Sequence, residues 1–151
     1  MAQLKETIST INDLIETLKD GQEGFRQAAE AVEDSELKSL FNESSLQRAR
    51  FVGELQSEAV TLGEPKPEDS GSAAGAFHRS WINLKGAIAK RDDHAILEEC
   101  ERGEDSAVHG YEEALEDKDL TGPVREIISR QYEKVKSVHD RIKHLRDATA
   151  S

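Results

Sequence analysis

Hydrophobic residues recur at alternating steps of four and three along most of this chain, and polar residues fill the positions between them. This spacing places the hydrophobic residues on one face of an α-helix. The first series predicts a helix over residues 3–33, and the second predicts a helix over residues 35–62 that ends at Gly63. Because the connection between them is very short, we expect these two helices to be antiparallel neighbours.

The second half of the chain shows the same spacing after an interruption. Residues 63–75 are rich in glycine, proline and serine and predict a loop. Further helices are predicted over residues 76–90, 93–117 and 123–147. No stretch alternates hydrophobic and polar residues as a half-buried strand does, so residues 1–151 are predicted to form a single all-α domain.

The segment between the two pairs of long helices decides the expected topology. A simple up-and-down bundle needs only a short loop at this point. The loop over residues 63–75 and the helix over residues 76–90 are together long enough to travel the length of the bundle. The helices over residues 35–62 and 93–117 would then run parallel, which is the connection found in a ferritin-like four-helix bundle.

Polar residues interrupt the hydrophobic face near the middle of each long helix. They are Gln22, Ser44, Arg48, Glu101, Glu104 and Gln131. Their similar heights predict a buried polar layer, in which Arg48 would pair with Glu104 or Glu101, because a buried charge is costly unless it is paired. Such a pair would fix the register of the helices. The same layer could instead hold a metal or small ligand, or its charges could face solvent if the pattern is locally out of phase.

Several segments carry a resemblance to known proteins. They are residues 20–30 (DGQEGFRQAAE), 48–55 (RARFVGEL), 75–82 (GAFHRSWI), 101–105 (ERGED) and 111–115 (YEEAL). Through them the chain resembles the ferritin-like superfamily and, within it, a small bacterial family of uncharacterised four-helix-bundle proteins, a domain-of-unknown-function family. The resemblance covers nearly the whole chain. It implies a ferritin-like bundle with a stress-linked role. A role as a protein-interaction module is a separate expectation that does not rest on the resemblance.

The ligands of a di-iron centre match this chain poorly. Di-iron ferritin-like proteins supply a glutamate from each of two helices and a Glu-x-x-His motif from each of the other two. Here residues 45–48 read Ser-Leu-Gln-Arg and residues 128–131 read Ile-Ser-Arg-Gln where such motifs would stand. An arginine at a ligand position would repel a cation and occupy the carboxylates. The leading interpretation is a non-enzymatic bundle with no cofactor, in which the polar layer replaces the di-iron centre.

Two other interpretations stay open. The first is a metal-binding protein or oxidase that holds iron or another divalent metal. Its best available ligands are Glu23, Glu30, Glu101, Glu104 and His139. The second is self-association through the helix over residues 76–90, with Phe77 and Trp81 as the interaction residues. These aromatic residues are expected to cover the side of the bundle, and only if exposed would they mark a partner site.

Charge and composition narrow the class of partner. The chain has 31 acidic and 20 basic residues, so its formal net charge is −11. This excess argues against nucleic acid or an anionic membrane surface as a partner. The N-terminus lacks the pattern of a signal peptide, and the lone Cys100 cannot form an internal disulfide. We therefore expect a cytoplasmic protein that binds an unidentified protein or a second copy of itself.

Overall fold

The computed structural model describes residues 2–63, 81 and 83–149, and these residues contain helices and no strands. The helices are α1 (Ala2–Ala31), α2 (Ser35–Thr61), α4 (Leu84–Ala89), α5 (Asp93–Glu116) and α6 (Gly122–Thr149). The predicted all-α class is confirmed for this part of the chain. None of these helices combines the length and the apolar character that crossing a membrane requires.

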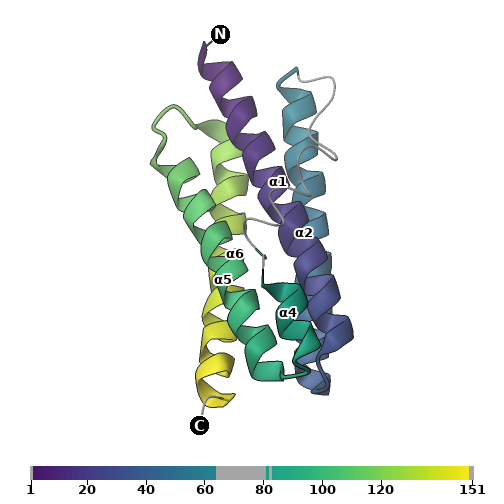
Figure 1. Ribbon diagram of the computed structural model, residues 1–151. Helices are drawn as coiled ribbons and strands as arrows, with labels where there is room; N and C mark the ends of the chain where they lie inside the picture. The colour runs from purple at the N-terminus through teal and green to yellow at the C-terminus, as the bar shows by residue number, and fades with distance from the viewer. Residues whose placement is uncertain (1, 64–80, 82, 150–151) are drawn as a thin grey trace.

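The long helices α1, α2, α5 and α6 lie side by side (Figure 1). α1 and α2 run in opposite directions, as do α5 and α6, whereas α2 and α5 begin at the same end of the molecule. Hydrogen bonds join the chain at this end. The Asp93 carboxylate at the start of α5 accepts from the backbone N–H groups of Glu33 and Asp34 at 3.1 and 3.2 Å. The turn between α1 and α2 is thus tied to the start of α5.

Aspartates mark the beginnings of two helices. Asp34 precedes α2, and its carboxylate accepts from the backbone N–H groups of Glu36 at 2.8 Å and Leu37 at 3.1 Å. Asp92 precedes α5 and accepts from the N–H group of His94 at 3.0 Å. These bonds satisfy donors that the first turn of a helix leaves without an intrahelical partner.

The segment before α5 differs from the prediction. The hydrophobic spacing predicts a helix over residues 76–90, whereas α4 spans only Leu84–Ala89. Trp81 lies in a bend and Asn83 in a turn, so the helix prediction is wrong at these positions. The physical reason is that the Trp81 indole inserts between two long helices instead of extending the apolar stripe of α4. The remaining residues before α4, like most of the predicted loop, lie outside the described part of the chain.

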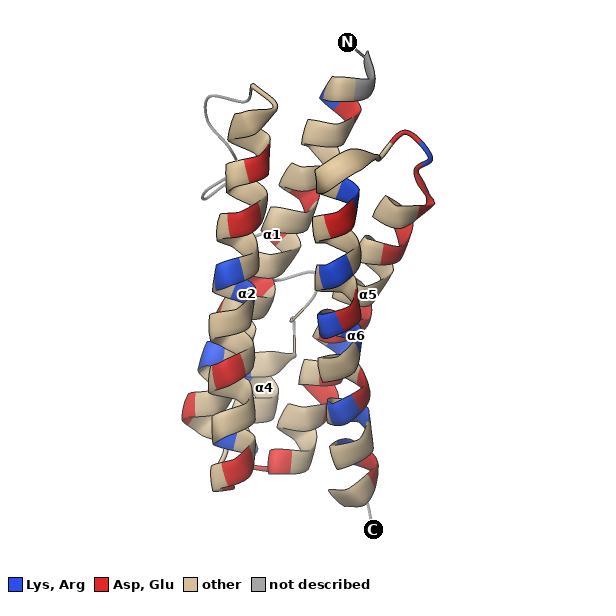
Figure 2. Cartoon of the chain, turned by 180° about the vertical axis from the view of Figure 1, so that it is seen from behind, with Lys and Arg blue, Asp and Glu red and all other residues tan. Residues whose placement is uncertain are grey.

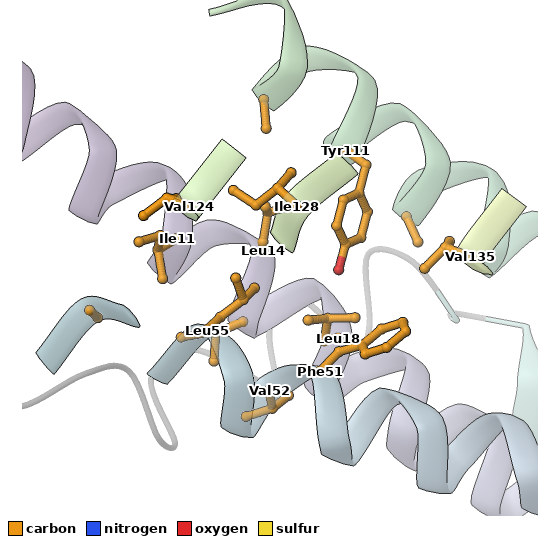
Figure 3. Packing of buried hydrophobic residues seen from close by; sticks show 14 of the residues in the cluster. Ile11, Leu14, Leu18, Phe51, Val52, Leu55, Tyr111, Val124, Ile128 and Val135 are labelled. Carbon is orange, nitrogen blue, oxygen red and sulfur yellow. The ribbon is translucent and has the colours of Figure 1, made fainter. Parts of the chain in front are cut away.

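Buried hydrophobic residues form two clusters, one toward each end of the bundle. The first, drawn in Figure 3, includes Ile11, Leu14, Leu18, Leu55, Tyr111 and Ile128. The second includes Phe25, Phe41, Trp81, Ile96, Leu97 and Ile142. In α1, α2 and α5 the predicted polar positions lie between the stretches that supply these two clusters. Apolar packing therefore encloses the polar groups from both sides.

The Trp81 side chain occupies the space between α1 and α5 next to two glycines, Gly24 and Gly103. Only 2% of Trp81 is exposed, and its ring meets Phe25 edge-on with the ring centroids 5.4 Å apart. A Cβ atom at Gly24 would lie 2.6 Å from the indole, and a Cβ atom at Gly103 would overlap it as well. The indole fits because neither position carries a side chain.

Replacing Gly103 by alanine should destabilise the protein, because overpacking a core costs about 1–3 kcal/mol. Gly53 in α2 is the matched control, since nothing lies within 4 Å of a Cβ atom built there. Gly53→Ala should stabilise the protein by roughly 0.5–1 kcal/mol through helix propensity. Urea unfolding followed by circular dichroism measures both variants. Equal effects of the two substitutions would contradict the packing of Trp81.

Candidate functional site

A buried ion pair lies midway along α2 and α5. The side chains of Arg48 in α2 and Glu104 in α5 are 1% and 0% exposed. Nη2 of Arg48 donates to Oε2 of Glu104 at 3.0 Å, and Nη1 donates to Oε1. Two parallel hydrogen bonds between charged groups give both strength and a defined geometry. The pair therefore fixes how α2 is placed against α5.

The surroundings hold the Arg48 side chain in one position. Its guanidinium carbon lies 5.3 Å from the centroid of the Phe25 ring, within the range of a cation–π interaction. Its Nε donates to Oε1 of Gln47 at 3.2 Å. A Cβ atom at Gly21 would lie 3.6 Å from Nη1, so α1 passes close to the guanidinium group. Three helices, α1, α2 and α5, thus enclose the ion pair.

A second polar network connects α5, α6 and α2. The Tyr111 hydroxyl donates to Oε1 of Gln131 at 2.7 Å. Nε2 of Gln131 donates to the Phe51 carbonyl at 3.3 Å and to Oε1 of Glu54 at 2.9 Å. The other Glu54 oxygen accepts from the exposed Arg130 at 2.7 Å. Burial raises the pKa of Tyr111 well above its ordinary value, so the phenol remains a donor.

The residues of the predicted polar layer do not form one group. All but one are buried, namely Ser44, Arg48, Glu101, Glu104 and Gln131. The exception, Gln22, is half-buried. The ion pair and the glutamine network are separate sets of hydrogen bonds among the described residues. The buried polar groups therefore find their hydrogen-bond partners in several separate sets, not in one connected layer.

Sequence reasoning missed two partners of these buried groups. Arg146 near the end of α6 donates to Glu101, so the alternative pairing of Glu101 with Arg48 is not what the structure contains. Tyr111 binds Gln131. Tyr111 follows Glu104 by seven residues, which places both on one helix face and predicts the burial of Tyr111 but not its partner. No comparable signal exists for Arg146, because it depends on the register of α6 against α5.

Three residues of the alternative metal set are occupied elsewhere. Glu23 and Glu30 lie on the solvent side of α1, with 45% and 69% of their side chains exposed, and both pair with Arg26. Glu104 is bound to Arg48. The five predicted ligands are therefore not brought together.

The other two residues of that set do approach each other. Glu101 and His139 lie close together, with Asp105 as a third potential ligand that sequence reasoning missed. The spacing of four residues between Glu101 and Asp105 was the available signal, because it places both carboxylates on one face of α5.

Of the two residues predicted for interaction, the structure describes Trp81 and not Phe77. Trp81 is buried, so it is not the exposed anchor that self-association through this segment would need. Phe77 lies outside the described residues.

The Cys100 thiol is also buried. Burial, together with the charges of Glu104 and Glu99, raises the pKa of this thiol well above its ordinary value. The structure therefore supplies no reactive thiolate at Cys100.

Comparison with known proteins matches residues 6–117 to a family described as a domain of unknown function (DUF2383). The matched range includes all of α2, α4 and α5 and most of α1, and it ends before α6. No curated protein matches the chain.

Arg48→Met alone should lower the free energy of unfolding by about 3–5 kcal/mol, because it leaves the Glu104 charge buried without its partner. Adding Glu104→Gln should recover most of this loss, since no unpaired charge then remains in the core. Arg26→Met, which removes two exposed ion pairs on α1, is the control and should change stability little. Urea unfolding of the single and double variants measures the coupling. Strictly additive effects of the two core substitutions would contradict this account of the pair.

Stability should fall as the pH rises above about 10, where an ordinary tyrosine ionises. The folded state keeps the Tyr111 proton that the unfolded state loses, so the unfolded state binds fewer protons and the free energy of unfolding decreases. The contribution of Tyr111 is fully present below its unfolded pKa and declines by up to about 1.4 kcal/mol per pH unit above it.

Tyr111→Phe should flatten this alkaline decline, measured as the free energy of unfolding in urea at successive pH values. The control is Tyr132→Phe, because the Tyr132 hydroxyl lies at the surface, where it donates to Glu112 at 2.8 Å. That variant should keep most of the decline. An unchanged slope in Tyr111→Phe would show that the buried phenol is not its source.

Proposed function

We propose that this chain, which belongs to the family described as a domain of unknown function (DUF2383), is a non-enzymatic ferritin-like four-helix bundle that acts as a protein-interaction module. Two features support the proposal. One is the direction of the helices, and the other is the buried ion pair at the place where ferritin-like bundles carry a metal centre.

The directions of the helices support the ferritin-like topology. α1 with α2 and α5 with α6 form two antiparallel pairs, and α2 and α5 run in the same direction. Two antiparallel pairs joined by one long crossover are the arrangement of ferritin-like bundles, whereas an up-and-down bundle would have α2 and α5 antiparallel.

The observation that carries the functional proposal is the pairing of Arg48 with Glu104. A metal ion at this place would meet the positive guanidinium group and would have to displace it from both carboxylate oxygens. Two of the polar positions on the other helices, Gln131 and the half-buried Gln22, carry amides, and the buried Glu101 is bound to Arg146. The centre is therefore built to fix helix register rather than to hold a reactive metal.

Because the buried centre has a structural role, the function of the protein is assigned to its surface. The Cys100 thiol and the Tyr111 phenol have raised pKa values and remain protonated near neutral pH, so neither is a ready nucleophile. Charged residues of both signs lie along α2 and α6 (Figure 2), within a chain of net charge −11. We assign the role to the binding of another protein or of a second copy of the chain.

Iron loading tests the absence of a reactive centre. Protein purified without chelator or affinity tag is incubated with Fe²⁺ in air and desalted, and its iron content is measured by plasma mass spectrometry. The His139→Gln variant is treated in parallel, because it removes a histidine that contacts two carboxylates, those of Asp105 and Asp140, and lies close to that of Glu101. We expect the variant to retain no iron and to oxidise Fe²⁺ no faster than buffer does.

Retention of about two iron ions per chain, with rapid oxidation of Fe²⁺, would refute the proposal, because it is the behaviour of a di-iron centre. Iron that is lost on His139→Gln substitution would belong to a different site and would leave the proposal intact. Sedimentation equilibrium of the same preparation separates the two kinds of partner, since a chain that remains at 16.8 kDa does not pair with its own copy.

A further inference from the structure

A cluster of potential metal ligands lies between α5 and α6 and is distinct from the central ion pair. Glu101 and Asp105 stand four residues apart on α5, and His139 faces them from α6. One ligand atom from each residue lies within 4.8 Å of the others. Because side chains four residues apart share a helix face, both carboxylates can reach the same ion as the imidazole.

The imidazole of His139 is oriented for this role. Its Nε2 lies 2.5 Å from Oδ1 of Asp105, and its Nδ1 lies 3.1 Å from Oδ1 of Asp140. Metal-bound histidines usually donate their second ring N–H to a carboxylate or carbonyl, which fixes the tautomer and turns the other nitrogen toward the metal. By contrast, His94 and His109 each face a single glutamate, four residues further along the same helix.

The charges around the cluster favour a cation. Carboxylates of Glu101, Asp105 and Asp140 surround the imidazole, and Arg146 supplies the positive charge that now contacts Glu101. The Arg146 side chain is 29% exposed and also pairs with the exposed Asp147. It can therefore move away from Glu101 toward solvent when a divalent ion takes its place.

We infer that Glu101, Asp105 and His139 form a binding site for a divalent transition metal such as Zn²⁺, which joins α5 to α6. Imidazole nitrogen with carboxylate oxygens is a ligand set that zinc and neighbouring metals accept. With metal–ligand distances of about 2.0–2.2 Å, ligand atoms around a tetrahedral ion lie about 3.3–3.6 Å apart. The ligand atoms now lie within 4.8 Å of one another, and side-chain rotation would bring them to that separation, which for Nε2 of His139 and Oδ1 of Asp105 means moving apart from 2.5 Å.

Solvent has access to the site, which leaves room for water as a further ligand. The Asp105 side chain is 61% exposed and that of His139 is 15% exposed. The inference goes beyond the proposed function and does not depend on it, because the site requires no metal between Arg48 and Glu104.

Titration with Co²⁺, whose visible absorption reports its coordination, followed by displacement with Zn²⁺, tests the site on the full chain. We expect one ion per chain. His139→Gln and Asp105→Asn should each weaken Zn²⁺ binding at least tenfold. His109→Gln is the matched control, because it removes another histidine that faces a glutamate, and it should leave the affinity unchanged.

Further variants separate a metal site from a structural hydrogen bond. Asp140→Asn should weaken binding about tenfold, as the loss of an outer-shell carboxylate does. Arg146→Gln should strengthen binding, because it releases Glu101 from a competing cation. Zn²⁺ should also raise the melting temperature of the parent protein and not that of His139→Gln.

Either of two results would overturn the inference. One is that neither the parent protein nor Arg146→Gln binds Co²⁺ or Zn²⁺. The other is that His109→Gln weakens binding as much as His139→Gln does. The exposed Asp105 can be replaced with little risk to the fold, so Asp105→Asn tests the site even if the protein does not tolerate His139→Gln. Loss of this site would leave the iron-loading result at the bundle centre unaffected.

Discussion

Glu104 is a carboxylate without access to solvent, and the helices around it are placed so that its charge is neutralised. A buried ion costs several kcal/mol unless it is paired and hydrogen-bonded. The side chain of Arg48 meets this requirement only if α2 lies in one register against α5, because both of its terminal nitrogens bind Glu104. A slide of one helix turn, about 5.4 Å, would leave both charges buried and unpaired. The pair thus favours one register of α2 against α5.

The second constraint is steric. The Trp81 indole takes the space between α1 and α5 that side chains at Gly24 and Gly103 would otherwise fill. On its edge it meets Phe25, whose ring lies in turn beside the Arg48 guanidinium group. The bulky core residue and the ion pair are therefore neighbours in one packed unit. Packing fixes the spacing of α1 and α5, while the charges fix the register of α2 and α5.

The stretch of α5 over residues 101–105 serves two different sites. Glu104 belongs to the closed centre with Arg48, whereas Glu101 and Asp105 meet His139 of α6. Helical geometry explains the division, since Glu101 and Asp105 stand four residues apart and share a face, whereas Glu104 comes one residue before Asp105 and points about 100° away from it around the helix. The ion pair of Glu104 with Arg48 has no access to water, and its role is structural. The site of Glu101, Asp105 and His139 is open to solvent on one side, and its carboxylate oxygens and imidazole nitrogen are the donors that divalent metals use.

The sequence by itself determined the all-helical class, the approximate extent of the long helices and the positions at which polar groups interrupt their apolar faces. These features are local, because hydrophobic spacing and capping residues such as Asp34 act within a few turns of one helix. The tertiary structure alone decided which polar residues meet: Arg146 with Glu101, Tyr111 with Gln131, and His139 with Asp105. It also decided the insertion of Trp81, where a helical spacing gave the wrong prediction. The physical reason is that the rotation and height of one helix against another depend on how all the side chains between them pack, and no single helix contains that information.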